Sequence, residues 1–303
     1  MFETELKSTL AAACTHTEWS WISSTIKQLS PGDLDTHPDT SPTGTDDLYI
    51  ALAMAGRMAG NKNLLMPSLG LVDWRQSDAA RVLFLLRYKD CVNFRTIIET
   101  AYRSGDEAER EAIAKGLYWL DSDGAALDLA LDICRTNIAT MMTSIAQNND
   151  YPGRYFSEHE FNQLVLKCLF YNFCITDIRQ LRERRNPSLS RMCIDYMRER
   201  LAADRNTPPT IWLAIRVTDL PDPAAILTEF LIPTSEHKPS ELEPSEPNTS
   251  QQEHTYQLLR SVAQDGDAFS QYYSIIEAYA RQEQSDEIIQ LIADIHNNKV
   301  DRL

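Results

Sequence analysis

The chain has 303 residues, of which 43% are hydrophobic, and it carries a formal net charge of −15 at pH 7. This composition excludes a disordered protein, because enough apolar residues are present to bury a core. The acidic balance argues against nucleic acid as a partner, since phosphate binding requires a basic surface.

The chain shows no sign of a membrane span or a secretory signal. No apolar run reaches the roughly 18 residues that cross a bilayer, and residues 1–7 are acidic and amphipathic rather than basic and then apolar. We therefore expect no transmembrane segment and a soluble, cytoplasmic protein. The six cysteines form no C-x-x-C pair and mostly lie among apolar residues, so we expect them to be buried and reduced.

Helical periodicity dominates the chain, and only 10 glycines are present. We expect an all-α fold, either an irregular stack of helical hairpins or a bundle of short antiparallel helices. Residues 30–45, rich in Pro, Thr and Asp, predict a loop, after which Thr45 can cap a helix that contains several small residues. In the N-terminal half, the apolar spacing predicts helices over 3–13, 18–29, 46–60, 78–89, 92–103 and 106–120.

The longest apolar stripe covers residues 124–148 and predicts a single amphipathic helix. Further helices are predicted over 158–174, 187–203, 209–217 and 222–231. The sequence thus favours a main helical domain over 1–232. Residues 233–252 mix five prolines with Ser and Glu, which predicts a disordered loop or linker. Residues 253–303 return to helical spacing, with helices over 254–264, 267–282 and 285–297 expected to pack on the main domain.

Residues 154–200 contain the clearest local signals. Ser157 and Glu160 form a capping box, so a helix begins near residue 158, and its apolar residues on nearly all sides predict a central, buried helix. Lys167 in that helix either reaches solvent along its stem or is buried with an anionic partner. Asn186 and Pro187 predict the N-cap and first residue of the next helix.

Positive charge is concentrated in this part of an acidic chain. Residues 154–216 hold 11 Lys or Arg and 7 Asp or Glu, a net charge of +4, so the remainder carries −15 − 4 = −19. Arginine offers a planar fork that suits phosphate or carboxylate. The four arginines between the two helices predict either an anion site or an internal clamp on acidic helices, and charge alone does not separate these interpretations. They are Arg179, Arg182, Arg184 and Arg185.

The same segment resembles the EboA domain family over roughly residues 150–210. The resemblance is carried by "YFSEHEFNQLVLKCLF" and "ERRNPSLSRMCIDYMRERLAADR". The chain departs from the family pattern at Thr176 and Asp177, where the family tends to have His-Arg, and at Arg182, where it tends to have an acid. The resemblance implies an all-helical protein that works beside secondary-metabolism enzymes, often near isoprenoid chemistry. The chain also resembles, more weakly, the humulene-forming sesquiterpene cyclases of fungi. Those enzymes are likewise helical and likewise lack the usual metal-binding motif of terpene cyclases.

These implications suggest a terpene cyclase, a lyase that ionises a prenyl diphosphate with the help of Mg²⁺. The predicted diphosphate ligands are Arg184, Arg191, Lys167 and Arg179, and the predicted polar pocket residues are Asn162, Gln163, Asn186 and Asp195. Asn149 and Asp150 are the predicted metal ligands, at the end of the long stripe. Asp121 and Asp123 resemble the start of a calcium loop, although a helix cap is the favoured interpretation.

The alternative function is a non-catalytic helical protein. Such a protein would bind or carry an isoprenoid or another hydrophobic metabolite, or would hold pathway enzymes together. No catalytic sequence motif of a hydrolase, P-loop protein, zinc protease or dinucleotide enzyme is present. The sequence therefore leaves both functions open, with the cyclase as the leading hypothesis.

Overall fold

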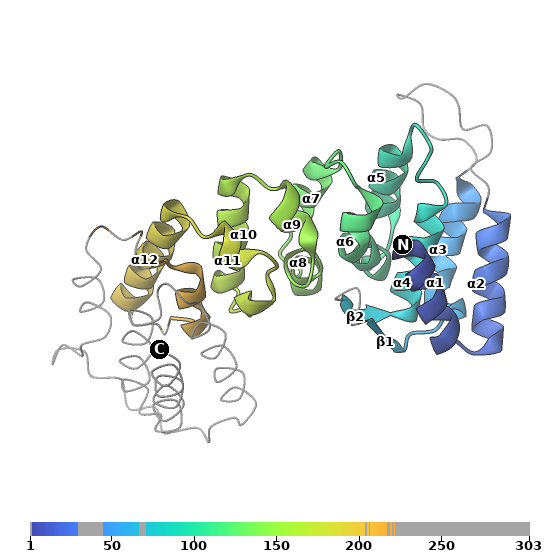
Figure 1. Cartoon of the computed structure of the whole chain (residues 1–303), viewed down its shortest axis with the longest axis horizontal. Helices are drawn as coiled ribbons and strands as arrows, with labels where there is room; N and C mark the ends of the chain where they lie inside the picture. The colour runs from blue at the N-terminus through green and yellow to red at the C-terminus, as the bar shows by residue number, and fades with distance from the viewer. Residues whose placement is uncertain are drawn as a thin grey trace, which may run out of the picture. The chain divides into compact units, whose positions relative to one another are not determined.

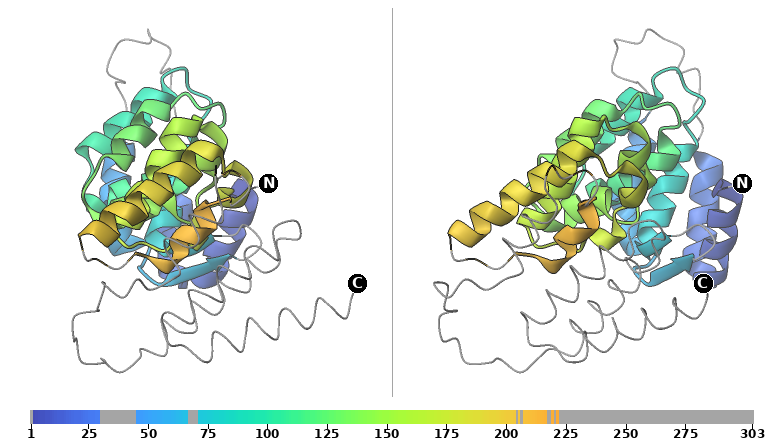
Figure 2. Two further views of the ribbon diagram at one scale, coloured as in Figure 1. Left: turned by 90° about the vertical axis from the view of Figure 1, so that its left-hand side faces the viewer. Right: turned by 60° about the vertical axis from the view of Figure 1, so that its left-hand side comes forward.

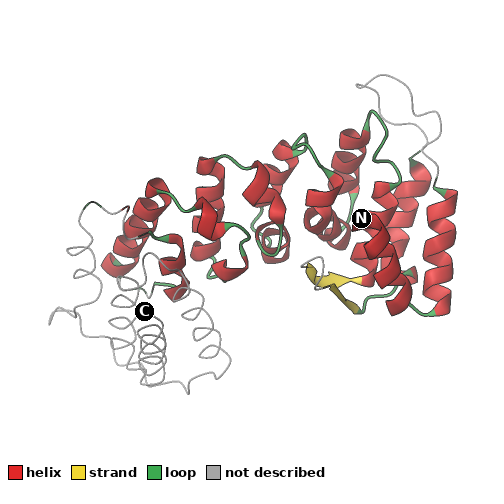
Figure 3. Cartoon of the chain, viewed as in Figure 1, coloured by secondary structure: helices red, strands yellow, loops and turns green. Residues whose placement is uncertain are grey.

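A computed structural model describes residues 2–29, 45–66, 71–203, 205, 207–216, 219 and 221. Within these residues the chain is helical apart from one two-stranded sheet (Figures 1 and 3). This confirms the expected helical stack.

The elements follow one another closely along the chain. The first part contains α1 (Phe2–Ala13), α2 (His16–Gln28), α3 (Asp46–Met58), β1 (Asn63–Met66), β2 (Leu71–Arg75), α4 (Gln76–Leu86), α5 (Phe94–Ser104) and α6 (Glu107–Leu120). The second part contains α7 (Leu127–Cys134), α8 (Ala139–Ala146), α9 (Asp150–Tyr155), α10 (Glu158–Phe170), the 3₁₀ turn η2 (Ile175–Asp177), α11 (Leu181–Arg184), α12 (Pro187–Ala202) and the 3₁₀ helix η3 (Pro209–Ala214).

The described residues fall into two compact units. Unit 1 holds those within residues 1–164 and 177–180, and unit 2 holds those within residues 165–176 and from 181 onward. The boundary between Leu164 and Val165 falls inside α10, so this helix begins in unit 1 and ends in unit 2.

Helix α4 is the centre of unit 1. Every residue from Gln76 to Leu85 is buried, because α1, α2, α3 and α6 all pack against it (Figures 1 and 2). The α4–α6 contact is close, since a Cβ atom on Gly116 would lie only 2.5 Å from Val82 Cγ2. A buried cation also fits here: Arg81 donates from Nε to the carbonyl oxygen of Leu52 at 3.0 Å. Small residues on α3 make room for it, as Gly56 shows.

Side-chain caps fix several helix starts. Capping boxes begin α2 at Thr15, α6 at Asp106 and α10 at Ser157, where the Ser157 amide donates to Glu160 at 2.7 Å. Asn186 caps α12 by accepting from the Leu189 amide at 2.8 Å, with Pro187 as the first helical residue. These last two caps were predicted. Thr45 does precede α3, but its side chain makes no capping hydrogen bond, so that part of the prediction is wrong.

The predicted single helix over 124–148 is also wrong. The chain forms α7 and α8 with a break at 135–138. Ile138, which the stripe placed on the buried face, is 46% exposed, while Leu129 and Ile133 are buried instead. Thr136 supports the break, because its hydroxyl accepts a hydrogen bond from the Ile138 amide at 3.1 Å.

Three further expectations need correction. Strands β1 and β2 pair antiparallel, with Asn63 opposite Arg75 and Leu64 opposite Trp74, although no hairpin was predicted. Helix α10 is not buried on all sides, because Phe170 is 65% exposed. Residues 209–217 begin as a 3₁₀ helix rather than an α-helix. The predictions for 222–303, and all but the last residue of the predicted loop 30–45, lie outside the described residues.

Candidate functional site

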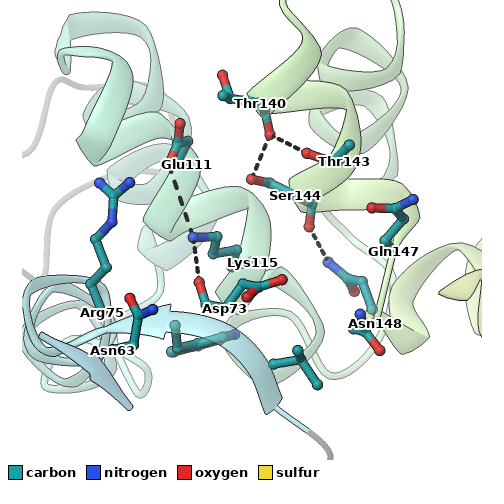
Figure 4. A pocket seen from close by; sticks show the side chains of 13 residues that line it. Asn63, Asp73, Arg75, Glu111, Lys115, Thr140, Thr143, Ser144, Gln147 and Asn148 are labelled. Atoms are coloured by element: carbon teal, nitrogen blue, oxygen red, sulfur yellow. Dashed lines mark hydrogen bonds and ion pairs between the residues drawn. The ribbon is translucent and has the colours of Figure 1, made fainter. Parts of the chain in front are cut away.

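A pocket of about 320 Å³ lies within unit 1. The hairpin of β1 and β2 forms one side, α6 and α8 form two more, and residues 147–149 close it (Figure 4). Most of its lining is polar, with Trp74 and Val72 as the main apolar contributions. Ligand sites in proteins commonly have volumes of about 300 to 1,000 Å³, so the pocket suits a small molecule.

Lys115 of α6 occupies the base of the pocket, between the hairpin and α4. Its Nζ donates to the Asp73 carbonyl oxygen at 2.9 Å and lies 3.9 Å from Glu111 Oε2 (Figure 4). It also donates to Asp78 Oδ2 at 3.0 Å. Asp78 also accepts from the Arg75 amide at 3.0 Å, and Arg81 lies 3.9 Å from its other oxygen. Lys115 is therefore locked in place by its neighbours.

Glu111 stands one turn before Lys115 on the same face of α6. The residue is 8% exposed, and its carboxylate lines the pocket. Among the described residues it makes an ion pair with Lys115 at 3.9 Å, which is longer than a hydrogen bond, and no hydrogen bond of its own. The carboxylate therefore keeps acceptor positions that the described residues leave open, at the edge of the pocket.

Helix α8 presents a polar stripe to the pocket, at spacings of three and four residues. Ser144 donates from Oγ to the Thr140 carbonyl oxygen at 2.8 Å, and Thr143 donates to the same oxygen at 3.0 Å (Figure 4). Thr140 donates to Glu107 Oε1 at 2.8 Å. A hydroxyl has one proton and two lone pairs, so these three oxygens remain acceptors toward the pocket.

Asn149 closes the pocket floor and begins α9. Its Nδ2 donates to the carbonyl oxygens of Ala114 at 2.9 Å and Ser144 at 3.1 Å, and its Oδ1 accepts from the Tyr151 amide at 3.0 Å. The residue is 2% exposed. These bonds tie α6, α8 and α9 together, so the Asn149 side chain has a structural role. Asp150, its predicted partner in metal binding, lies with Oδ2 3.9 Å from Arg179 Nε.

Two pocket residues hold backbone conformations that side chains rarely adopt. Asp73 has φ 61° and Asn148 has φ 52°. Such conformations carry an energetic cost and cluster at functional sites. At Asp73 the left-handed backbone accompanies the carbonyl contact with Lys115, and at Asn148 the amide donates to the Asp177 carbonyl oxygen at 2.7 Å.

The turn after α6 is organised by Asp121. Oδ1 accepts from the amides of Gly124 and Ala125 at 3.1 and 3.2 Å, while Oδ2 accepts from the Ala126 amide at 2.8 Å and the Tyr151 hydroxyl at 2.6 Å. Burial by itself would raise the pKa of Asp121, but the hydrogen bonds from Tyr151, Ala126 and Asp123 outweigh burial and hold this pKa below its ordinary value. Burial and the Asp121 carboxylate together raise the pKa of Tyr151 far above its usual range. Asp121 thus caps the amides of the turn between α6 and α7, and the N-cap residue of α7 is Ala126 rather than Asp121.

The residues that the sequence assigned to a diphosphate site fall into both units. Arg179 belongs to unit 1, while Lys167, Arg184 and Arg191 belong to unit 2. The Lys167 ammonium lies 5.9 Å from the centroid of the Tyr171 ring, and Arg184 is half-buried with its carbonyl oxygen accepting from Asn186 Nδ2 at 3.0 Å. Arg191 is exposed. Convergence of these cations on one ligand stays a prediction.

The four residues predicted to form a polar pocket also belong to both units. Asn162 is buried and Gln163 is exposed on α10, in unit 1. Asn186 caps α12, and Asp195 is exposed on that helix, 3.7 Å from Arg198. None of these four residues lines the pocket of unit 1. Of the predicted site residues, Asn149 alone lies there.

Cysteine and acidic residues give no sign of a metal centre in the described part of the chain, which holds no group of three or more His, Cys, Asp or Glu able to bind one. All six cysteines are free. Cys168 and Cys193 are buried, and burial raises the pKa of each thiol to about 12, so both remain protonated and unreactive.

Sequence reasoning missed the residues that form the pocket. The polar stripe of α8 was visible in the sequence, because Thr140, Thr143, Ser144 and Gln147 follow helical spacing. Such a stripe ordinarily faces solvent, and only the packing of α8 against α6 turns it toward a cavity. The Glu111–Lys115 pair likewise has the spacing of a common exposed ion pair.

Comparisons with known proteins support one family. No curated protein and no solved structure matches the chain, and none of the described helices combines the length and apolar composition that a bilayer crossing requires. The model of one protein family, described as "Metabolite traffic protein EboA", matches residues 3–216, which include every described element from α2 to α12 and the whole pocket. The chain therefore belongs to the EboA family.

Proposed function

We propose that this protein is a non-catalytic metabolite carrier that holds a small molecule in the unit 1 pocket. The family description supports transport of a metabolite rather than terpene cyclisation. The single observation that carries the proposal is the pocket itself, about 320 Å³ in volume and bordered by fixed side chains. A preformed cavity of this size binds small ligands without the cost of ordering its walls.

The character of the pocket lining sharpens the expected cargo. Hydroxyl, amide and carboxylate groups outnumber apolar ones, and Glu111 and Ser144 are buried. A wholly hydrocarbon ligand would leave these groups without partners, which is unfavourable. The cargo, or the part of it that enters this pocket, is therefore polar, in contrast with the isoprenoid expected from the sequence.

Binding can be tested with a metabolite extract. The purified chain is incubated with the extract, separated from unbound material and examined by native mass spectrometry. We expect one bound species whose mass equals that of a compound in the extract, because a carrier returns its cargo unchanged.

A bulky variant locates the binding site. Thr143→Trp fills the pocket from the half-buried face of α8, so we expect it to abolish the bound species. Thr17→Trp is the matched control, since Thr17 is exposed on α2 and lies outside the pocket. Equal binding by both variants would remove the pocket from the proposal.

The cyclase alternative has its own test. The protein is incubated with farnesyl or geranylgeranyl diphosphate, with and without Mg²⁺, and hydrocarbon and free diphosphate are measured. We expect no metal-dependent release of diphosphate. Turnover that requires Mg²⁺ would contradict the carrier proposal and restore the enzyme hypothesis.

A further inference from the structure

We infer that the unit 1 pocket recognises its ligand through the ligand's hydrogen-bond donors, hydroxyl or ammonium groups, with the Glu111 carboxylate as the main acceptor. This inference rests on the proposed carrier function and names the class of cargo. A site with this chemistry differs from a diphosphate site, because a diphosphate needs hydrogen-bond donors and cations rather than acceptors.

Glu111 carries the first part of the argument. Glu111 lies on a helix that packs against α4 and α8, its side chain is 11% exposed, and its carboxylate makes no hydrogen bond among the described residues. An ionised carboxylate has about four acceptor positions. A hydroxyl or ammonium group in the cavity would fill positions that the protein leaves open, while an anion would be repelled.

Lys115 does not cancel that acceptor. Its ammonium makes its two hydrogen bonds with Asp78 and the Asp73 carbonyl, at 3.0 and 2.9 Å, both shorter than its 3.9 Å separation from Glu111. Charge alternates along the series Arg81, Asp78, Lys115 and Glu111, and the last two both line the cavity, with Glu111 at the end of the series. Because Glu111 has no further cation beyond Lys115 in this series, its carboxylate oxygens are available as acceptors for a ligand.

Helix α8 supplies the second part. The hydroxyl protons of Thr143 and Ser144 are directed to carbonyl oxygens of their own helix, at 3.0 and 2.8 Å. Their remaining lone pairs therefore line the cavity opposite α6 (Figure 4). Acceptors on α6 and α8 together match a molecule with several donors, such as a polyol or a diamine.

Four probes distinguish the ligand classes. myo-Inositol and putrescine carry hydroxyl and ammonium donors, respectively, while citrate and inorganic phosphate are anionic acceptors. Each is titrated into the full chain, with dissociation constants and binding location obtained from NMR chemical-shift changes. We expect at least one donor probe to bind at the pocket, and the comparison of the polyol with the diamine identifies which donor is preferred.

Glu111→Gln tests the named acceptor. The substitution keeps the shape but removes the charge, so we expect donor-probe affinity to fall by about tenfold or more. Lys115 retains Asp78 at 3.0 Å, which preserves the fold, and the melting temperature verifies this. Thr143→Val should weaken binding by about threefold. Glu158→Gln is the matched control, because Glu158 is exposed at the start of α10 and lies outside the pocket.

The outcomes separate this inference from the proposed function. Donor binding that is weakened by Glu111→Gln and unaffected by Glu158→Gln supports the inference. Citrate or phosphate bound in the pocket, with Arg75 at its edge, would overturn the inference while leaving a carrier function in place. Absence of all four probes from the pocket overturns the inference, and the extract experiment then decides the carrier function on its own.

Discussion

The unit 1 pocket and the basic segment over 154–200 differ in how their charges are used. In the pocket, Asp78 and Lys115 are buried or nearly so and contact each other at 3.0 Å, and the cavity lies beside them. In the basic segment, Arg191, Asp195 and Glu199 lie on an exposed helical face. The sequence signal was stronger in the second region, whereas a cavity with charged side chains at its border occurs in the first. A concentration of charge along the chain therefore does not reveal where buried charges border a cavity.

The largest effect is expected at the turn that supports the pocket region. Asp121→Ala removes the acceptor for four backbone amides and leaves the buried Tyr151 hydroxyl without its partner. We expect a loss of about 3 to 5 kcal/mol in the free energy of unfolding, measured by urea denaturation. Asp128→Ala, at a carboxylate whose side chain is 84% exposed, is the control and should change stability little. Equal losses in both variants would show that burial does not distinguish the two sites.

Asn149→Ala should have the next largest effect. The variant loses the N-cap of α9 and the hydrogen bonds to Ala114 and Ser144, for an expected cost of about 2 kcal/mol. The same melting curves test the sequence-based metal prediction for this residue. If Asn149 is structural, Mg²⁺ and a chelator give equal melting temperatures in the unaltered protein. Stabilisation by Mg²⁺ that disappears in Asn149→Ala would instead identify a metal site.

Acid should weaken the pocket region through Asp121. Its pKa in the folded protein lies below the ordinary value of 3.8, so the unfolded chain takes up the proton more readily. The stabilisation is therefore fully present when the pH is above that ordinary value, and it is lost as the pH falls through the folded pKa. Unfolding free energies measured from pH 6 to pH 2 should show this loss, and Asp121→Asn should reduce the dependence on pH. An unchanged pH profile in Asp121→Asn would assign the acid sensitivity to other groups.

The smallest effect is expected in the basic segment. Arg191 is exposed, so Arg191→Glu should change the free energy of unfolding by no more than about 0.5 kcal/mol. We also expect no change in the affinity of the unit 1 pocket for its ligand. Titration with farnesyl diphosphate sharpens the comparison, since a tenfold loss of affinity in this variant would establish the basic segment as a diphosphate site after all.

Local signals in the sequence were sufficient to predict two helix starts. The capping box of Ser157 and Glu160 and the N-cap at Asn186 were predicted because their side chains can bond to the free amides at a helix start. The structure confirms both caps. The helical class followed from apolar spacing. Helix breaks were harder, since the stripe over 124–148 keeps its period across the four residues that separate α7 from α8.

The hairpin and the pocket depend on contacts between distant residues. β1 and β2 have four and five residues, too few for a clear alternation of apolar and polar side chains. Asp73 and Lys115 are 42 positions apart, and their contact forms only when α4 brings the hairpin against α6. No spacing rule within one helix could have revealed this contact, which is why the sequence analysis did not point to the pocket.

The left-handed backbone of Asp73 has a consequence for protein engineering. Glycine adopts a φ of 61° without the steric penalty that an aspartate meets, but it also raises the conformational entropy of the unfolded chain, so Asp73→Gly has two opposing effects on stability. The same exchange would loosen the hairpin edge that holds the Lys115 ammonium and would delete a carboxylate from the mouth of the cavity. A redesign for thermal endurance that selects glycine here would therefore change the lining of the cavity together with the stability of the fold.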